Sequence, residues 1–92
     1  MKTSKQALRR RMAAIDARME AASFARGGDA PCMVAVWGRA QDAVCAAESA
    51  LAADDLRAAA AALDDASAAM REHAAMLRSA RAFLARGEEA SR

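Results

Sequence analysis

A seven-residue apolar repeat in the C-terminal half of the chain restricts its fold more than any other feature. The repeat consists of Leu56, Leu63, Met70, Leu77 and Leu84. A second apolar row lies one position before it and consists of Ala62, Ala69, Met76 and Phe83. Such a repeat places one apolar stripe along an α-helix that packs against a nearly parallel or antiparallel neighbour. The pattern therefore predicts a long helix whose stripe must be covered.

Composition supports an all-α fold made of thin helices. Alanine accounts for 30 of the 92 residues, and it is the strongest helix former. Each alanine methyl group buries little apolar area, so an alanine-rich core is weak. A chain of this length forms one domain, here residues 1–92, and buries only a modest fraction of its surface. We therefore expect the fold to gain stability from another chain.

The N-terminal region predicts a first helix over residues 4–26. Its apolar positions alternate spacings of four and three, as in a coiled-coil seam, and are Leu8, Met12, Ile15, Met19 and Ala22. Ser4 is a candidate N-cap. Gly27 and Gly28 end the helix and form a flexible joint.

A second helix is expected over residues 30–53. Asp29 is a cap candidate, and Pro31 follows in the first turn, where its missing N–H does no harm. The apolar seam consists of Trp37, Val44 and Leu51, flanked by Met33, Ala40 and Ala47. Trp37, the largest apolar side chain, is expected to anchor the packing.

The chain either turns at Asp54–Asp55 or continues as one long helix through residues 30–86. Continuing the second seam would bury one of these two carboxylates, which is costly. A turn with an aspartate capping a third helix over residues 55–86 is therefore preferred. This helix is expected to stop at Gly87 and leave residues 88–92 as a frayed tail. The prediction is a three-helix antiparallel bundle with coiled-coil-like seams.

The turn region reads Ala50-Leu51-Ala52-Ala53-Asp54-Asp55-Leu56-Arg57-Ala58-Ala59. With this segment, residues 40–70 resemble a single tetratricopeptide-like helical hairpin. Asp54 stands where that pattern has glycine, and Leu56 stands where it has an aromatic residue. The resemblance implies a hairpin whose concave side accepts a peptide helix, as in small helical secretion chaperones and adaptors.

Charge is distributed unevenly along the chain. The net charge is +2 overall, and residues 1–26 carry seven Lys/Arg against two acidic residues. One interpretation is nonspecific, salt-dependent nucleic-acid binding through the basic residues of the first helix. Those residues are Lys5, Arg9, Arg10, Arg11 and Arg18. The other interpretations are that this face lies on the acidic hairpin of the same chain, or that it is simply solvated.

The sequence contains no pattern typical of catalysis, metal binding or cofactor binding. His73, the only histidine, flanks the apolar stripe and is expected to be a half-buried packing residue. Cys32 and Cys45 lie thirteen positions apart, on different faces of one helix, and are expected to be small buried apolar groups. With no membrane-span pattern and no secretory signal, we expect a cytoplasmic protein that is not an enzyme.

These observations predict a protein–protein interaction module: a small helical chaperone, adaptor or inhibitor. It would bind a partner's amphipathic helix or associate with itself, as a homodimer or a hetero-complex. The candidate contact residues are apolar seam residues from all three helices: Leu8, Met12, Ile15, Met19, Trp37, Met76 and Phe83. Nucleic-acid binding is the alternative.

Overall fold

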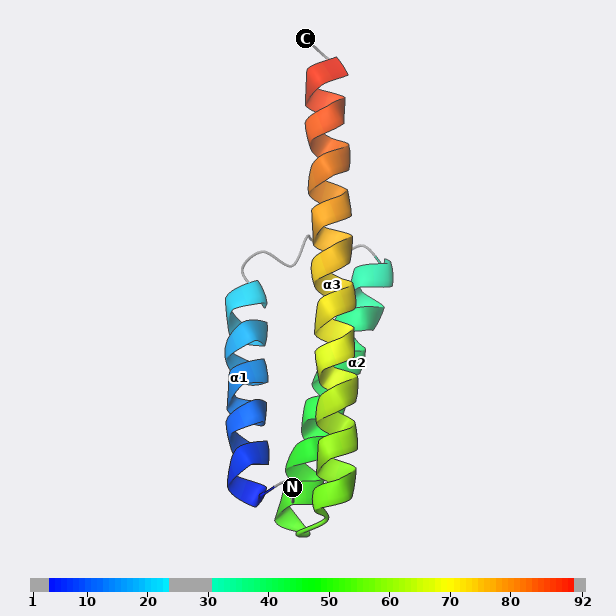
Figure 1. The fold of residues 1–92 in the computed structure, drawn as a ribbon. Coiled ribbons are helices and arrows are strands. Elements are labelled where there is room, and N and C mark those ends of the chain that lie inside the picture. The colour runs from blue at the N-terminus through cyan, green and yellow to red at the C-terminus, as the bar shows by residue number, and fades with distance from the viewer. Residues whose placement is uncertain (1–3, 24–30, 91–92) are drawn as a thin grey trace.

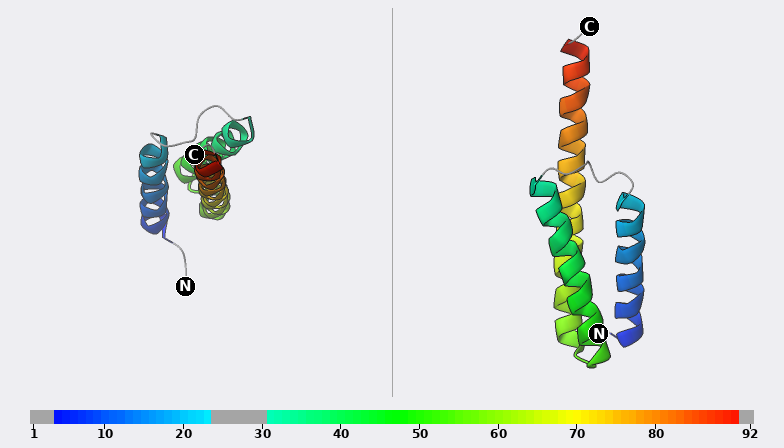
Figure 2. Two further views of the ribbon diagram at one scale, coloured as in Figure 1. Left: turned by 90° about the horizontal axis from the view of Figure 1, so that it is seen from above. Right: turned by 180° about the vertical axis from the view of Figure 1, so that it is seen from behind.

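The computed structural model describes residues 4–23 and 31–90, and within these ranges every regular element is an α-helix (Figure 1). Helix α1 spans Lys5–Ser23, α2 spans Pro31–Ala52 and α3 spans Leu56–Ala90. Consecutive helices run in opposite directions, so α2 and α3 form an antiparallel hairpin with α1 packed beside it (Figures 1 and 2). The predicted all-α three-helix bundle is confirmed. The predicted helix end at residues 24–26 and the joint at residues 27–28 lie outside the described residues.

The helix starts follow local capping rules. The backbone N–H of Ala7 donates a 3.0 Å hydrogen bond to the Ser4 hydroxyl oxygen, so Ser4 caps α1 as predicted. Pro31 is the first residue of α2, a position where proline costs no backbone hydrogen bond. The predicted cap Asp29 lies outside the described residues.

The α2–α3 connection is a tight turn, as predicted, so residues 31–86 do not form one continuous helix. Asp54 has a φ of 57°, in the left-handed region. The N–H of Asp54 donates to the carbonyl of Leu51 at 3.1 Å, and the N–H of Asp55 donates to that of Ala50 at 2.8 Å. These two bonds form a Schellman motif, which satisfies the last carbonyls of α2. The Asp55 carboxylate accepts a 3.1 Å bond from the Ala58 N–H and caps α3.

Helix α3 is longer than predicted. It runs through Gly87 to Ala90, so the predicted stop at Gly87 and the predicted frayed tail over residues 88–90 are wrong. Glycine in a helix interior costs only about 1 kcal/mol relative to alanine, and that penalty alone does not end a helix. The molecule is consequently elongated, with extents of 57 × 24 × 19 Å.

The core consists of two adjoining clusters of buried side chains. The larger cluster joins all three helices and contains Leu8, Ile15, Val44, Ala47, Leu51, Ala59, Ala62, Leu63 and Ala66. The smaller cluster joins α2 to α3 and contains Val36, Ala40, Ala69 and Met70. Alanine is frequent in both, and small side chains allow helix axes to approach closely. The bundle is therefore thin.

Helix α1 is attached to the hairpin by apolar packing and by surface ion pairs. Leu8 and Ile15 insert into the larger cluster. The Lys5 ammonium lies 2.5 Å from the Asp54 carboxylate, and the Arg11 guanidinium lies 2.8 Å from Asp64. The basic first helix therefore packs on the acidic hairpin of its own chain.

Candidate interaction surface

The buried face of α3 is a stripe with alternating spacings of three and four residues. Its buried members are Ala59, Ala62, Leu63, Ala66, Ala69, Met70 and His73. This alternation keeps the stripe on the side that faces α2 and α1. The positions of Ala59 and Ala66, which are fully buried, lie between the two apolar rows that the sequence analysis identified. Their three- and four-residue spacing from Ala62 and Leu63 places them on the same face of the helix.

The stripe continues to the end of the region that the other helices cover and then past it. Its next members are Met76, which packs against the smaller cluster, Leu77, Ala80 and Phe83. Exposure rises along this series, from 1% at His73, through half-buried side chains, to 69% at Phe83. The C-terminal part of α3 extends past the ends of α1 and α2 (Figure 1). We call residues 74–87 the rod, and Met76, Leu77, Ala80 and Phe83 the uncovered stripe.

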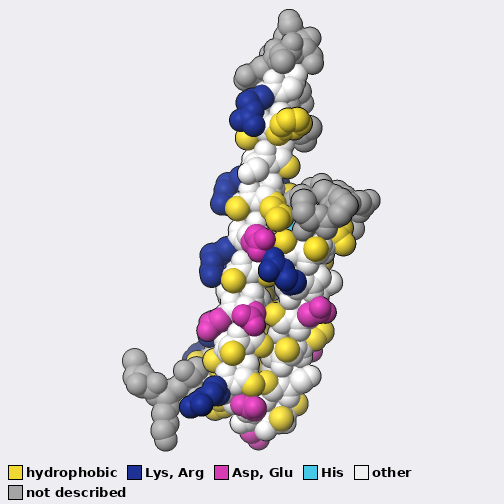
Figure 3. Space-filling model, turned by 90° about the vertical axis from the view of Figure 1, so that its right-hand side faces the viewer, with side chains coloured by type: hydrophobic (Ala, Val, Ile, Leu, Met, Phe, Trp, Pro, Cys, Tyr) yellow, Lys and Arg dark blue, Asp and Glu magenta, His cyan; other side chains and the backbone are white. Residues whose placement is uncertain are grey.

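The rod is basic as well as apolar. Residues 74–87 contain Arg78, Arg81 and Arg86 and no aspartate or glutamate, and Glu88 and Glu89 follow at the end of the helix. At about 100° per residue, Arg81 and Arg86 flank the uncovered stripe on opposite sides, and Arg78 lies on the back of the helix. In the space-filling view, basic side chains follow one edge of the projecting helix, with hydrophobic side chains beside them (Figure 3). The rod therefore has the character of a basic amphipathic helix.

A second surface feature lies between α1 and α2. It is a groove of about 560 Å³ lined by Asp16, Met19, Glu20, Trp37, Gln41, Asp42, Val44 and Cys45. Its apolar lining comes from Met19, Trp37 and Val44, its acidic groups come from both helices, and no lysine or arginine lines it. Asp16 and Asp42 form no ion pair within the described residues. We call this feature the acidic groove.

Trp37 and His73 meet at the upper end of the bundle, next to the start of the rod. Their ring centroids are 5.1 Å apart, and the ring planes are tilted by 58°. The sequence predicted a half-buried histidine, but His73 is 1% exposed, because α3 turns it toward α2. Its Nε2 atom is buried without a hydrogen-bond partner among the described residues. Trp37 packs half-buried against the smaller cluster.

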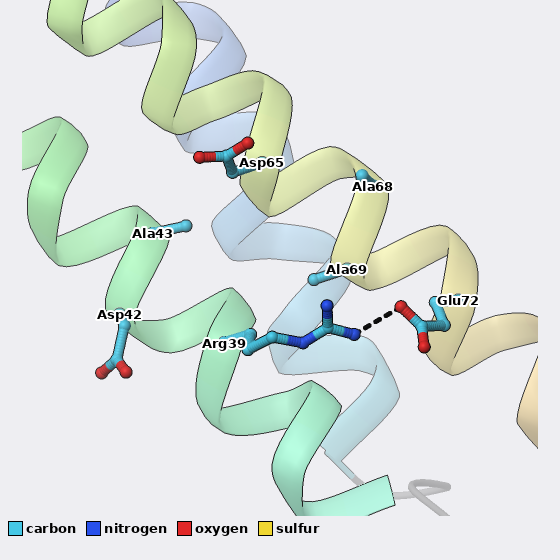
Figure 4. Close-up of a pocket in the computed structure, with 7 residues that line it drawn as sticks. All are labelled: Arg39, Asp42, Ala43, Asp65, Ala68, Ala69 and Glu72. Carbon is cyan, nitrogen blue, oxygen red and sulfur yellow. Dashed lines mark hydrogen bonds and ion pairs between the residues drawn. The ribbon is translucent and has the colours of Figure 1, made fainter. Parts of the chain in front are cut away.

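A shallow hollow between α2 and α3 is lined by charged side chains that do not point toward a common centre. In it, Arg39 reaches across from α2 to Glu72 on α3 and pairs with it, whereas Asp42 points away (Figure 4). Both partners are largely exposed, and exposed ion pairs contribute little to stability. The Arg39–Glu72 ion pair thus links α2 to α3 across the surface of the hairpin.

The predicted contact residues separate into three groups. Leu8 and Ile15 are buried in the larger cluster, so their apolar surface is used within the chain. Met12, Met19, Trp37 and Met76 are half-buried at the edges of the core. Phe83 is exposed on the rod. The structure therefore leaves Phe83 the most accessible of the seven, and Met76 lies two helical turns before it on the same side of α3.

The basic residues of α1 are only partly engaged. Lys5 and Arg11 form the ion pairs with the hairpin, whereas Arg9, Arg10 and Arg18 are exposed. The Lys5 ammonium, by hydrogen bonding and by its charge, holds the pKa of Asp54 below its ordinary value of 3.8. The basic N-terminal surface is thus partly neutralised by its own hairpin.

Within residues 4–23 and 31–90, no group of three or more His, Cys, Asp or Glu side chains is placed to hold a metal ion. Cys45 is a free thiol and is exposed, so the prediction that it is buried is wrong. Its position follows from the groove, which leaves that side of α2 uncovered. The side chain of Cys32 is not described. Among the helices of the described chain, none is long and apolar enough to cross a membrane.

Comparisons of the chain with known protein families, with curated proteins and with solved structures found no match. The tetratricopeptide-like resemblance of residues 40–70 therefore stays a prediction. The acidic groove was not anticipated, because its lining comes from two helices whose relative rotation no local pattern specifies. The sequence showed the uncovered stripe as an apolar repeat, but it did not show that the other helices end before covering all of it.

Proposed function

We propose that this protein is a non-enzymatic, cytoplasmic protein–protein interaction module that presents the uncovered stripe of α3 to a helix of another polypeptide chain. Chaperones, adaptors and inhibitors of larger assemblies are the classes that use such a surface. The recognition mode is helix packing, in which apolar residues at three- and four-residue spacings meet a complementary apolar face. The free thiol of Cys45 is compatible with a reducing compartment.

One observation carries the proposal. The apolar stripe of α3 keeps its spacing after His73 while its cover decreases: Met76 still packs against the smaller cluster, Leu77 lines a hollow with residues of α1, and Phe83 is exposed. Phe83 is 69% exposed at the end of this series, and aromatic anchors are enriched among residues that dominate binding energy. An isolated exposed apolar residue is ordinary, whereas a continuous series in core register is typical of a contact surface.

The nucleic-acid alternative has weaker support. Two of its five residues, Lys5 and Arg11, are paired with Asp54 and Asp64, which lowers the positive charge available to phosphates. The described residues place no aromatic side chain beside the exposed arginines of α1 for base stacking.

A face-specific photo-crosslinking experiment tests the proposed function. A photoreactive phenylalanine analogue replaces Phe83 on the stripe, or Ala82 on the opposite face, in the cells that make the protein. We expect a discrete crosslinked protein from position 83 and none from position 82. Equal crosslinking from both positions, or none from either, contradicts the proposal.

A further inference from the structure

We infer that the partner of the rod is a second copy of this chain, and that each rod docks in the acidic groove of the other copy. This inference rests on the proposed function, because it names the occupant of the same uncovered stripe. It adds the receiving surface, which lies between α1 and α2, and it commits to a reciprocal dimer.

Charge complementarity is the first argument. The rod has Arg81 and Arg86 beside its stripe and no acidic residue over 74–87. The groove has three carboxylates, no basic residue, and an apolar lining that includes Trp37. Asp16 and Asp42 have no partner among the described ion pairs, so docking supplies counter-charges to both surfaces.

The two surfaces also match in length. Along α2 the groove extends from Trp37 to Cys45, which corresponds to about 12 Å of helix. The uncovered stripe extends from Met76, whose other side packs on the smaller cluster of its own chain, to Phe83, about 10 Å. Phe83, the exposed aromatic residue, therefore has an apolar lining of comparable extent to enter.

A rod cannot reach the groove of its own chain. Helix α3 is unbroken from Leu56 to Ala90, so the rod continues away from the bundle (Figure 2). The groove lies on the bundle, between α1 and α2. Both halves of the contact are thus present in one chain but separated in space, which is the condition for pairing between copies.

Reciprocal docking is favoured over direct packing of one uncovered stripe on another. Stripe-to-stripe packing brings the arginines of two rods together, and in α3 beyond His73 only the terminal Glu88 and Glu89 carry the opposite charge. It also leaves both grooves unfilled. Exchange of rods forms two contacts per pair and is closed by two-fold symmetry, which limits assembly to a dimer. Two contacts also approach the area of a stable interface better than one short helix does.

Sedimentation of charge-reversed variants tests the pairing. One variant combines Arg81→Glu with Arg86→Glu and reverses the charge beside the stripe of the rod. Another combines Asp16→Arg with Asp42→Arg and reverses the charge of two groove residues. We expect the wild-type chain to form dimers, and each variant alone to lose at least about tenfold in dimer affinity through like-charge contacts. Mixing the two variants restores dimers, because each rod then meets a groove of opposite charge. Arg78→Glu, on the back of α3, is the matched single-charge control and leaves the dimer intact when compared with Arg81→Glu.

Several outcomes overturn the inference. They are a wild-type chain that stays monomeric at millimolar concentration, a mixture that stays monomeric, and a groove-reversed variant that dimerises normally. The last result indicates stripe-to-stripe packing instead. Circular dichroism of each variant establishes that a lost dimer is not a lost fold.

Cys45 provides a second, independent test, because it lines the groove. In a Cys32→Ser background, Ala80→Cys places a thiol on the uncovered stripe, and Ala82→Cys places one on the opposite face. Under mild oxidation we expect an intermolecular disulfide from Ala80→Cys and none from Ala82→Cys. Adding Cys45→Ser must abolish it, and a disulfide that persists without Cys45 contradicts docking in the groove.

The two proposals fail separately. If the chain is monomeric but position 83 still crosslinks to a different protein, the interaction module stands and the second copy is excluded as its partner. If dimers form through the groove, crosslinking at position 83 yields a species of twice the chain mass.

Discussion

Asp54 is the residue on which the hairpin depends most directly. Its φ of 57° lies in the left-handed region, which costs a residue with a side chain about 1–2 kcal/mol and glycine almost nothing. Aspartate tolerates this region better than most residues, and its carboxylate reaches Lys5 on α1. One side chain therefore occupies the cap of α2 and also ties α1 to the turn.

Substitution at Asp54 separates these two roles. Asp54→Gly removes the left-handed strain, and we expect it to raise the free energy of unfolding by up to about 1 kcal/mol despite losing the exposed ion pair. Asp54→Ala loses the same carboxylate but keeps the Cβ atom, and is expected to be destabilising. Urea denaturation measures both, and equal stabilities for the two variants contradict the backbone argument.

The ion pair of Asp54 with Lys5 predicts an acid-dependent contribution to stability. The pKa of Asp54 is lowered in the folded chain, so the unfolded chain binds the proton more readily. The contribution is complete above the ordinary pKa of 3.8 and is lost as pH falls through the lower, folded value.

Lys5→Met removes the cation responsible for that shift. We expect the stability difference between wild type and Lys5→Met to be present near neutral pH and to vanish in strong acid. Thermal denaturation over an acidic pH series measures it. A difference that grows as the pH falls has the wrong sign for this mechanism.

The buried Nε2 of His73 predicts that an apolar residue is tolerated better there than the native one. A buried, unpaired polar atom costs about 1–3 kcal/mol. We expect His73→Leu to raise the free energy of unfolding by about 1 kcal/mol, and His73→Ala to lower it by about 2 kcal/mol or more through cavity formation. Chemical denaturation decides between these outcomes. Marked destabilisation by His73→Leu indicates that Nε2 has a solvent partner in solution.

At the scale of elements, the seven-residue repeat predicted α3, because helical periodicity is a local property, and the turn at Asp54–Asp55 predicted its antiparallel pairing with α2. Ser4, Pro31 and Asp55 likewise act where capping rules place them. Phe83 shows the limit of this reasoning. It has the same register as Ala62 and Ala69, but it is exposed, because α2 has 22 residues and α3 has 35.

Two helical glycines distinguish the bundle from the rod. A Cβ atom added at Gly38 in α2 or at Gly87 in α3 meets nothing within 4 Å. We expect Gly38→Ala to stabilise the bundle by about 0.5–1 kcal/mol, since alanine is the better helix former. Gly87→Ala should raise helical content measured by circular dichroism while leaving the unfolding midpoint unchanged. An equal shift of the unfolding midpoint by both variants contradicts the idea that the rod contributes little to the stability of the bundle.

At the scale of the whole molecule, the structure divides into a packed bundle and an uncovered rod. Amides of the bundle, around Leu63, are in the buried core, whereas those around Phe83 lie in one helix without tertiary cover. Local opening free energies follow such differences.

Hydrogen exchange at low protein concentration is expected to show strong protection over residues 59–73 and weak protection over residues 79–87. Raising the concentration should protect the second range selectively, because docking covers it. Mass spectrometry of peptides from the exchanged protein measures both ranges. Uniform protection at low concentration contradicts the division.

The unbroken backbone of α3 also fixes how the tip is oriented. Inserting one residue between His73 and Met76 turns everything beyond it by about 100°, whereas inserting seven moves it outward by about 10 Å with nearly the same facing. The facing of the tip relative to the bundle is therefore fixed by the helix, and only insertions of whole heptads in this segment preserve it.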